Sequence, residues 1–425
     1  MKTILMRGSF FKNVLILMSG TVIAQVITIA ISPILTRLFR PSDFGVLGVY
    51  MSVVSIVTAV ATLRYDQALM LPKGDRDAAH LFWASLFSVA GVSLIILILC
   101  ILFLKQIPLL LKVPELKVWV LFLPLSIFLA GFYQTLNSWS TRQKQFKRAS
   151  IAQVAKSFVT SVVQMLSGIL RIGPAGLIGG AVLGDVSSSL TLAFHVKRFD
   201  NRILKEGLRY HSIKQLGKQY SDFPIYSSMQ NLLNAISQNA PLILLAKFYN
   251  PAVVGFYALG VRVLQLPMNL ILTSLRQVLF QKASEVYNES GDTYVLFKNI
   301  VLGLGSIAII PATLVILFGP VMFAFVLGKE WSVAGEYARW LTLWLSLQFL
   351  NLPAIILVQV HRKQRFLFFY DLFLFIFRLS ALIIGGFYCT ALNSIIFYSS
   401  IGALFNFFII IYMWFFLRNH KLKIC

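Results

Sequence analysis

Several ionisable side chains lie inside stretches of sequence that are otherwise long and apolar. They are Arg64, Asp66, Lys156, Asp185, Arg262, Arg276, Asp371 and Arg378. A charge in such a setting is costly, and it usually faces a cavity that carries a ligand or an ion. Arginine suits phosphate in particular, because its planar guanidinium binds two oxygens at once. The first chemistry that these residues suggest is therefore the binding of an anion.

Arg262 has no acidic neighbour along the chain. It stands in the stretch ALGVRVLQLPMNLIL (258–272), and no Asp or Glu occurs from Phe223 through Ser284. It lies about ten residues from either end of its predicted helix, too deep for the side chain to reach the membrane surface. An ion pair with a distant acid is one explanation for this charge, and an anionic ligand is the other.

The other internal charges extend this imbalance. Arg378 is central in its predicted helix, and Asp371 lies about 10 Å from it along the axis, which is too far for close contact. Lys156, like Arg276, is near enough to a helix end to reach the surface instead. We expect the anion site to consist of Arg64, Arg262, Arg378 and Lys156, and any coupled ion to use Asp66, Asp185 or Asp371. No metal site is expected, since the three cysteines are scattered.

Polar side chains form a stripe on two predicted helices. The first stripe includes Gln25 and Thr28, and the second includes Asn231, Asn234 and Gln238. Their spacing of three to four residues, or multiples of a turn, places each set on one helix face. Either these side chains join helices to one another, or they line a water-filled cavity. We favour the cavity, because the two stripes occupy corresponding helices.

Composition identifies the elements that must position these residues. The chain of 425 residues is 58% hydrophobic and only 12% charged, with a mean hydropathy of +0.79. These values indicate an all-α polytopic membrane protein rather than a soluble one. The net charge of +23 then reflects Lys and Arg in cytoplasmic loops, not nucleic-acid binding, and it predicts that both termini are cytoplasmic.

Apolar runs predict about twelve transmembrane helices. They are 12–35, 44–70, 80–104, 118–136, 151–170, 175–194, 224–246, 252–280, 295–318, 334–359, 367–388 and 394–417. The longest connection is basic, and it divides the chain into a six-helix lobe (1–194), a cytoplasmic linker (195–223) and a second six-helix lobe (224–425). The remaining connections are too short to hold a catalytic domain, so an enzyme is not expected.

The two predicted halves repeat a turn between their first and second helices. TRLFRPSDFGVLGVY (36–50) aligns with LAKFYNPAVVGFYALG (245–260), so that Pro41 corresponds to Pro251. Proline is favoured at the first position of a helix, where its missing N–H group costs nothing. The repeat predicts two bundles of related structure with a ligand site between them.

Four motifs carry a resemblance to a known family. They are the turn at 36–50, LRYDQALMLP (63–72), VVGFYALGVRVLQLPMNLI (253–271) and VLGKEWSVAGEY (326–337). Together they resemble the Wzx-type oligosaccharide flippases of the MOP superfamily, which are related to the MATE exporters. The resemblance implies that Arg64 and Asp66 occupy the basic and acidic positions of the second helix, and Arg262 the arginine of the eighth. Gln281 departs from the proline that often closes the eighth helix.

The resemblance also implies a function. It is that of a flippase, which moves undecaprenyl-diphosphate-linked oligosaccharide from the cytoplasmic to the outer leaflet of a bacterial plasma membrane by alternating access. The product would feed O-antigen (lipopolysaccharide), capsule or similar assembly. We expect no cofactor, an ion gradient as the driving force, and a polysaccharide polymerase and chain-length regulator as partners.

Two alternatives stay open. One is a MATE-like drug or cation antiporter, which should carry acidic rather than basic residues in its cavity. The other is a membrane polysaccharide polymerase, which should show a large outer loop.

Overall fold

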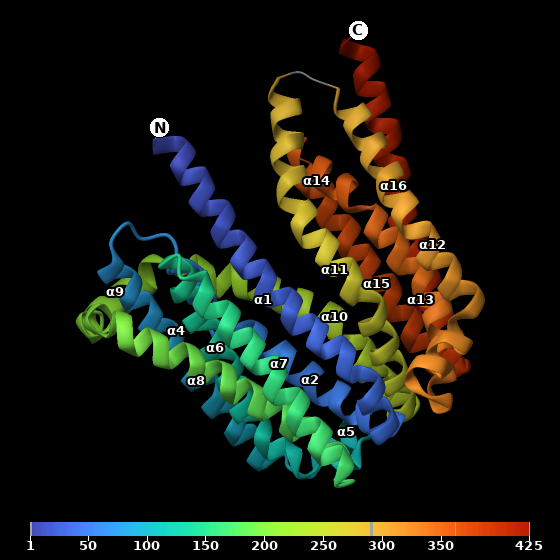
Figure 1. Ribbon diagram of the computed structural model, residues 1–425, viewed down its shortest axis with the longest axis horizontal. Coiled ribbons are helices and arrows are strands. Elements are labelled where there is room, and N and C mark those ends of the chain that lie inside the picture. The colour runs from blue at the N-terminus through green and yellow to red at the C-terminus, as the bar shows by residue number, and fades with distance from the viewer. Residues whose placement is uncertain (1, 290–291, 362, 425) are drawn as a thin grey trace. The chain divides into compact units, whose positions relative to one another are not determined.

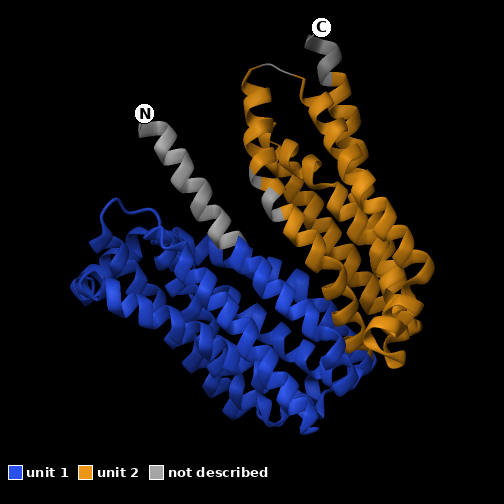
Figure 2. Cartoon of the chain, viewed as in Figure 1, with its two compact units in different colours: residues 1–252 blue, residues 253–425 orange. Residues whose placement is uncertain are grey.

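The computed structural model describes the backbone of residues 2–289, 292–361 and 363–424, and side chains there except at 2–18, 273, 274, 277 and 420–424. All regular elements within these described ranges are helices (Figure 1). They form two compact units, residues 1–252 and 253–425 (Figure 2).

Unit 1 contains all the described helices of the first half together with α9 and α10. Its main elements are α1 (Lys2–Leu38), α2 (Pro41–Ala61), α3 (Tyr65–Ala68), α4 (Asp75–Leu102), α5 (Gln106–Leu110), α6 (Leu123–Arg142), α7 (Phe146–Ile169), α8 (Pro174–Glu206), α9 (Tyr210–Gln219) and α10 (Ser228–Phe248). α7 packs against both α1 and α8, and α10 packs against α2. Glycine permits the close contact of α7 with α8, since a Cβ at Gly184 of α8 would collide with Thr160 of α7.

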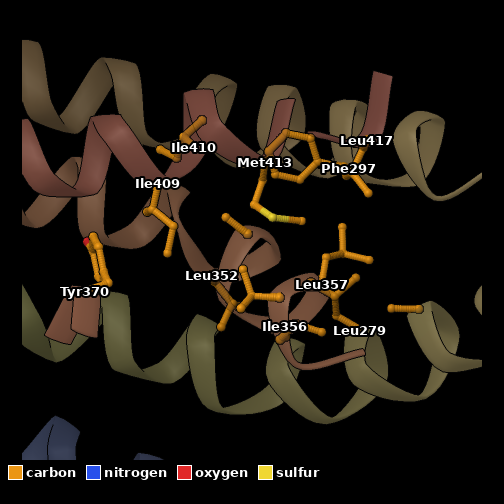
Figure 3. Packing of buried hydrophobic residues seen from close by; sticks show 13 residues of the cluster. Leu279, Phe297, Leu352, Ile356, Leu357, Tyr370, Ile409, Ile410, Met413 and Leu417 are labelled. Atoms are coloured by element: carbon orange, nitrogen blue, oxygen red, sulfur yellow. The ribbon is translucent and has the colours of Figure 1, made fainter. Parts of the chain in front are cut away.

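Unit 2 contains α11 (Pro251–Asn288), α12 (Thr293–Leu327), α13 (Ser332–Leu350), α14 (Leu352–Val360), α15 (Gln364–Tyr388) and α16 (Ala391–Ile424). Phe297, Leu357 and Met413, from three of these helices, are buried in one core (Figure 3). Pro41 and Pro251 begin α2 and α11, as the repeated turn predicts. The predicted lobes 1–194 and 224–425 follow the sequence repeat. The compact units have a different boundary, because α10 belongs to unit 1.

The protein is a multi-pass membrane protein. Ten helical segments in the described part of the chain are long and apolar enough to cross a membrane. The other two predicted spans coincide with α7 and α10, which have 24 and 21 residues but are more polar. Large apolar side chains such as Phe325 and Phe387 lie on the outer surface, 84% and 70% exposed. Exposing such side chains to lipid chains costs little free energy, whereas exposing them to water is unfavourable.

Most predicted helices differ from the structure in their limits, and three of these differences change the arrangement of elements. The predicted helix 44–70 is wrong beyond Ala61, because Leu63 and Arg64 adopt the left-handed conformation, with φ of 48° and 59°. The predicted helix 175–194 continues to Glu206, so the segment expected as a linker holds the end of α8 and all of α9. The predicted helix 334–359 divides at Asn351 into α13 and α14.

Candidate anion-binding site

Arg378 is held between two aromatic side chains of unit 2. Its guanidinium carbon lies 3.7 Å from the ring centroid of Trp344 and 3.8 Å from that of Tyr398. The two rings meet edge to face, with centroids 5.5 Å apart and an interplanar angle of 81°. A guanidinium over an aromatic face is stabilised by about 0.5–2 kcal/mol. We call Arg378, Trp344 and Tyr398 the arginine clamp; it joins α15, α13 and α16.

Neighbouring residues fix the rings of the clamp. Gly402 of α16 lies against Trp344, since a Cβ at this glycine would be 2.7 Å from Trp344 Cδ1. Tyr257 of α11 packs edge to face on Tyr398, with ring centroids 6.3 Å apart. Tyr257 and Tyr398 are both buried. The plane of the guanidinium is therefore set by four helices of the same unit.

The hydrogen-bonding capacity of Arg378 is largely unused. Its Nε and Nη2 atoms are buried and have no hydrogen-bond partner among the described residues. Asp371, on the same helix, is exposed and forms no ion pair within the described ranges. Buried donors without a partner cost about 1–3 kcal/mol each, and more when charged. An anion that accepts from these atoms would recover that cost.

Arg262 is a second cation of unit 2. It is exposed on α11, and no hydrogen bond or ion pair joins it to any described residue. Tyr257, which touches the clamp, is five residues earlier on this helix, about 140° away around the axis. Arg262 and the clamp therefore start from different faces of α11. Neither Arg262 nor Arg378 has a carboxylate partner in the described part of unit 2.

In unit 1 the turn after α2 is built around Asp66. Its buried carboxylate accepts hydrogen bonds from Thr62 Oγ1 (2.6 Å) and from Gln134 Nε2 (2.8 Å) of α6. The Arg64 backbone N–H donates to Thr62 Oγ1 (3.3 Å), and the Arg64 Nε is buried without a partner among the described residues. Arg64 and Asp66 are neighbours in the turn, and no ion pair joins them there.

Replacing Asp66 should destabilise this turn. We expect Asp66→Ala to cost about 1–3 kcal/mol, because Thr62 and Gln134 would lose the acceptor of their buried hydrogen bonds. Asp66→Asn should cost less, since its amide oxygen still accepts one of the two bonds. Thermal unfolding of the detergent-solubilised protein measures both. Asp77→Ala, at an exposed aspartate of α4, is the control. An Asp66→Ala variant that melts with the wild type would show that these bonds contribute nothing.

Lys156 and Asp185 form an ion pair between α7 and α8. The carboxylate is buried, with 7% of its side chain exposed, whereas 41% of the lysine side chain is exposed. The pair unites a residue predicted to bind an anion with one predicted to couple an ion. Its net charge is zero, so the excess of positive charge rests on the arginines.

The amides of α10 divide by their contacts. Asn231 Nδ2 donates to the backbone oxygen of Ala59 on α2 (2.7 Å), and Asn239 Nδ2 donates to Ser55 Oγ on the same helix (3.2 Å). These two residues join helices, which is the other explanation of the polar stripe. The sequence prediction did not include Asn239. The only signal for it in the sequence is that it lies about two helical turns after Asn231, on the same side of α10.

The other four residues expected to contact a glycan form no hydrogen bond to another helix among the described residues. Asn234 and Gln238 are exposed on α10. On α1, Thr28 donates to the Ala24 oxygen of its own helix (3.0 Å), and the Gln25 Oε1 is buried without a partner in the described chain. Asn234, Gln238 and Gln25 therefore keep polar groups free for a ligand.

Comparison with known proteins gives one curated relative and several structures of the same fold. The chain is 21% identical to the succinoglycan biosynthesis transport protein ExoT of Rhizobium meliloti (strain 1021) over 71% of its own length. The match spans 59% of that relative. An inward-facing multidrug resistance MATE family transporter of the MOP superfamily matches with a TM-score of 0.73 at 15% identity, covering 93% of this chain and 95% of that one.

The lipid II flippase MurJ, in an inward closed conformation, matches with a TM-score of 0.70 at 16% identity, covering 95% of this chain and 93% of that one. These similarities show the fold, which the chain shares with a MATE family transporter and with a lipid II flippase. The family described as polysaccharide biosynthesis protein matches residues 34–336. With most of its length inside that match, the chain belongs to the polysaccharide biosynthesis protein family.

Proposed function

We propose that the protein is a flippase for undecaprenyl-diphosphate-linked oligosaccharide repeat units, which it moves from the cytoplasmic to the outer leaflet for surface polysaccharide assembly. The observation that carries the proposal is the arginine clamp, whose charged donors are buried and unused. Membership of a polysaccharide biosynthesis family and a fold shared with a lipid II flippase support it.

A diphosphate fits the clamp chemically. The oxygens of the diphosphate accept from the Nε and Nη2 atoms of Arg378, which lie in one plane and can bind two oxygens of the same group. The rings of Trp344 and Tyr398 hold that plane, so little conformational entropy is lost on binding. Arg262 is a further cation of the same unit. Lys156 contributes less, because Asp185 neutralises it.

The glycan and the driving ion need other residues. Gln25, Asn234 and Gln238 carry the amide groups that would hydrogen-bond the sugar hydroxyls. Asp66, Asp185 and Asp371 are the acids that would couple transport to an ion gradient. Partners in this assembly would be a polysaccharide polymerase and a chain-length regulator, which use the exported repeat unit.

The alternative of a drug or cation antiporter shares the fold, as the MATE similarity shows. A cationic cargo would favour unpaired carboxylates, yet Asp66 is hydrogen-bonded and Asp185 is paired with Lys156. Of the three internal acids, this leaves Asp371 without an ion pair in the described ranges. Among the internal charges of the described chain, Arg64, Arg262 and Arg378 are left without an ion-pair partner. A cavity of this sign attracts anions and repels cations.

Arg262 provides the test of this function. In a flippase-null strain, Arg262→Ala should lower surface polymer at least about tenfold, since losing one charged contact of about 1.4 kcal/mol has this effect on affinity. Arg262→Lys should restore part of it. Arg276→Ala, at an exposed arginine of the same helix, is the control and should keep wild-type polymer. Membrane protein levels are matched by immunoblot.

The lipid fraction of the same cells checks the substrate. Loss of the protein should leave lipid-linked repeat units on the cytoplasmic leaflet. Full polymer with Arg262→Ala would remove Arg262 from the mechanism. Drug sensitivity of the null strain, without accumulation of the lipid-linked intermediate, would favour the antiporter instead.

A further inference from the structure

A groove of about 660 Å³ lies in unit 1 beside the amphipathic helix α9. Phe87 of α4 lines one side, Tyr210, Lys214 and Lys218 of α9 line another, and Ile225 lies in the segment Phe223–Ser227 that precedes α10. None of the residues considered above as ligands for a transported anion lines it. The groove has the size of typical small-molecule sites, about 300–1,000 Å³.

Packing against unit 1 holds α9 in place at the base of the groove. Ile213, which lines the groove, is buried, and Leu216 packs with Tyr65 against the cluster of Ala68, Leu69 and Leu81. The Tyr65 hydroxyl donates to the Gly217 backbone oxygen (3.1 Å). Burial raises the pKa of Tyr65, so the hydroxyl keeps its proton at neutral pH. The position of α9, and with it the groove, is therefore fixed by packing rather than by its lysines.

The two lysines give the groove a positive charge. Lys214 and Lys218 are one helical turn apart and therefore project from the same face. Both are exposed, and neither forms an ion pair with a carboxylate in the described ranges. Glu206, just before α9, is already engaged with Arg76 and Arg202. A phosphate group between the lysines would contact two ammonium groups. It would not have to displace a carboxylate from either lysine.

Apolar side chains continue the groove away from the lysines. Phe87 is 52% exposed, Ile225 59% and Tyr210 78%. Such a combination, with basic residues on one side of a short helix and large apolar residues beside it, is typical of helices that lie at a membrane surface. Basic pockets at this level bind lipid head groups, and their attraction to anionic lipid is strong only near the surface.

We propose that this groove binds one anionic phospholipid, with its phosphate between Lys214 and Lys218 and an acyl chain along Phe87 and Ile225. Charge complementarity selects the anionic lipid, since a zwitterionic head group brings its own cation to the lysines. The site does not depend on the transported substrate, and it stands whether or not the proposed function holds.

Native mass spectrometry of the full-length protein in mild detergent tests the proposal. Phosphatidylglycerol is titrated against phosphatidylethanolamine, with wild type and Lys214→Gln/Lys218→Gln. We expect the double variant to bind phosphatidylglycerol about tenfold or more weakly. Lys197→Gln/Lys205→Gln removes the same charge from exposed positions of α8 outside the groove, and it should bind as the wild type does. Lys214→Arg/Lys218→Arg should retain binding, and matched melting temperatures confirm that each variant is folded.

Four results would overturn the proposal. Equal weakening in both glutamine variants would mean diffuse attraction rather than a site, and equal affinity for the two phospholipids would mean no recognition of charge. Displacement of phosphatidylglycerol by millimolar inorganic phosphate would show a site for a soluble anion. A polyprenyl diphosphate that binds more tightly than phosphatidylglycerol, and needs the same lysines, would assign the groove to the transported substrate.

Discussion

Cells that carry Arg378→Ala in place of the wild-type protein should make less than about a tenth of the normal surface polysaccharide. The change removes the buried donors Nε and Nη2, and it also empties the space between Trp344 and Tyr398. Arg378→Lys should recover less activity than the corresponding change at Arg262, because an ammonium group cannot present two coplanar donors between the rings. Surface polymer in a flippase-null strain measures both variants.

The control for this prediction lies on the same helix. Arg365 is exposed near the start of α15, and Arg365→Ala should leave polymer unchanged. Trp344→Phe and Tyr398→Phe keep an aromatic face, so they should weaken transport only severalfold. Full polymer with Arg378→Ala at matched membrane levels would refute a role in transport. A melting temperature that falls together with activity in every clamp variant would assign the clamp to folding.

The aromatic half of the clamp is beyond the reach of sequence reasoning. The central position of Arg378 in an apolar helix marks it as unusual, since an arginine there needs a partner or a cavity. Trp344 and Tyr398 belong to different helices, and nothing in their spacing shows that both rings meet the guanidinium. Gly402 is the faint signal, because a small residue in an apolar helix often marks a close contact.

The turn at Leu63 and Arg64 shows a different limit. Local signals there favour continued helix, since neither glycine nor proline interrupts the sequence between Ala61 and Asp66. Left-handed conformations are uncommon for residues other than glycine, so propensity argues against the break. Hydrogen bonds of Asp66 stabilise the turn instead. Its carboxylate accepts one from Thr62 and one from Gln134 of α6.

Breaks with a local cause were easier to anticipate. Pro353 lacks a backbone N–H group, so it is favoured in the first turn of a helix over a helix interior. The structure divides the predicted span 334–359 at Asn351, two residues upstream, and Pro353 lies in the first turn of α14. Asn351 is buried there and donates to Asn406 of α16. The proline can be read directly from the sequence. The hydrogen bond between Asn351 and α16 cannot, because it depends on how the helices pack.

The ion pair of Lys156 and Asp185 predicts an asymmetry between two single substitutions. Lys156→Met should destabilise the protein by about 1–3 kcal/mol, because it leaves a buried carboxylate without its partner. Asp185→Asn should cost less, since the partly exposed lysine can turn toward solvent or the head groups. The double variant Lys156→Met/Asp185→Asn should recover most of the loss, as it removes both charges. Thermal unfolding in detergent measures all three.

Transport by the same variants separates a structural ion pair from a coupling group. If the pair only joins α7 to α8, transport should follow stability, and the double variant should transport nearly as well as the wild type. If Asp185 couples transport to an ion, Asp185→Asn should lose transport while it melts near the wild type, and the double variant should stay inactive despite its recovered stability. An equal loss of stability in both single variants would contradict the burial asymmetry on which the prediction depends. Lys156 neutralises the Asp185 carboxylate in the structure, so a coupled ion would have to displace the lysine. The double variant removes both the lysine and the carboxylate, so it can no longer bind that ion.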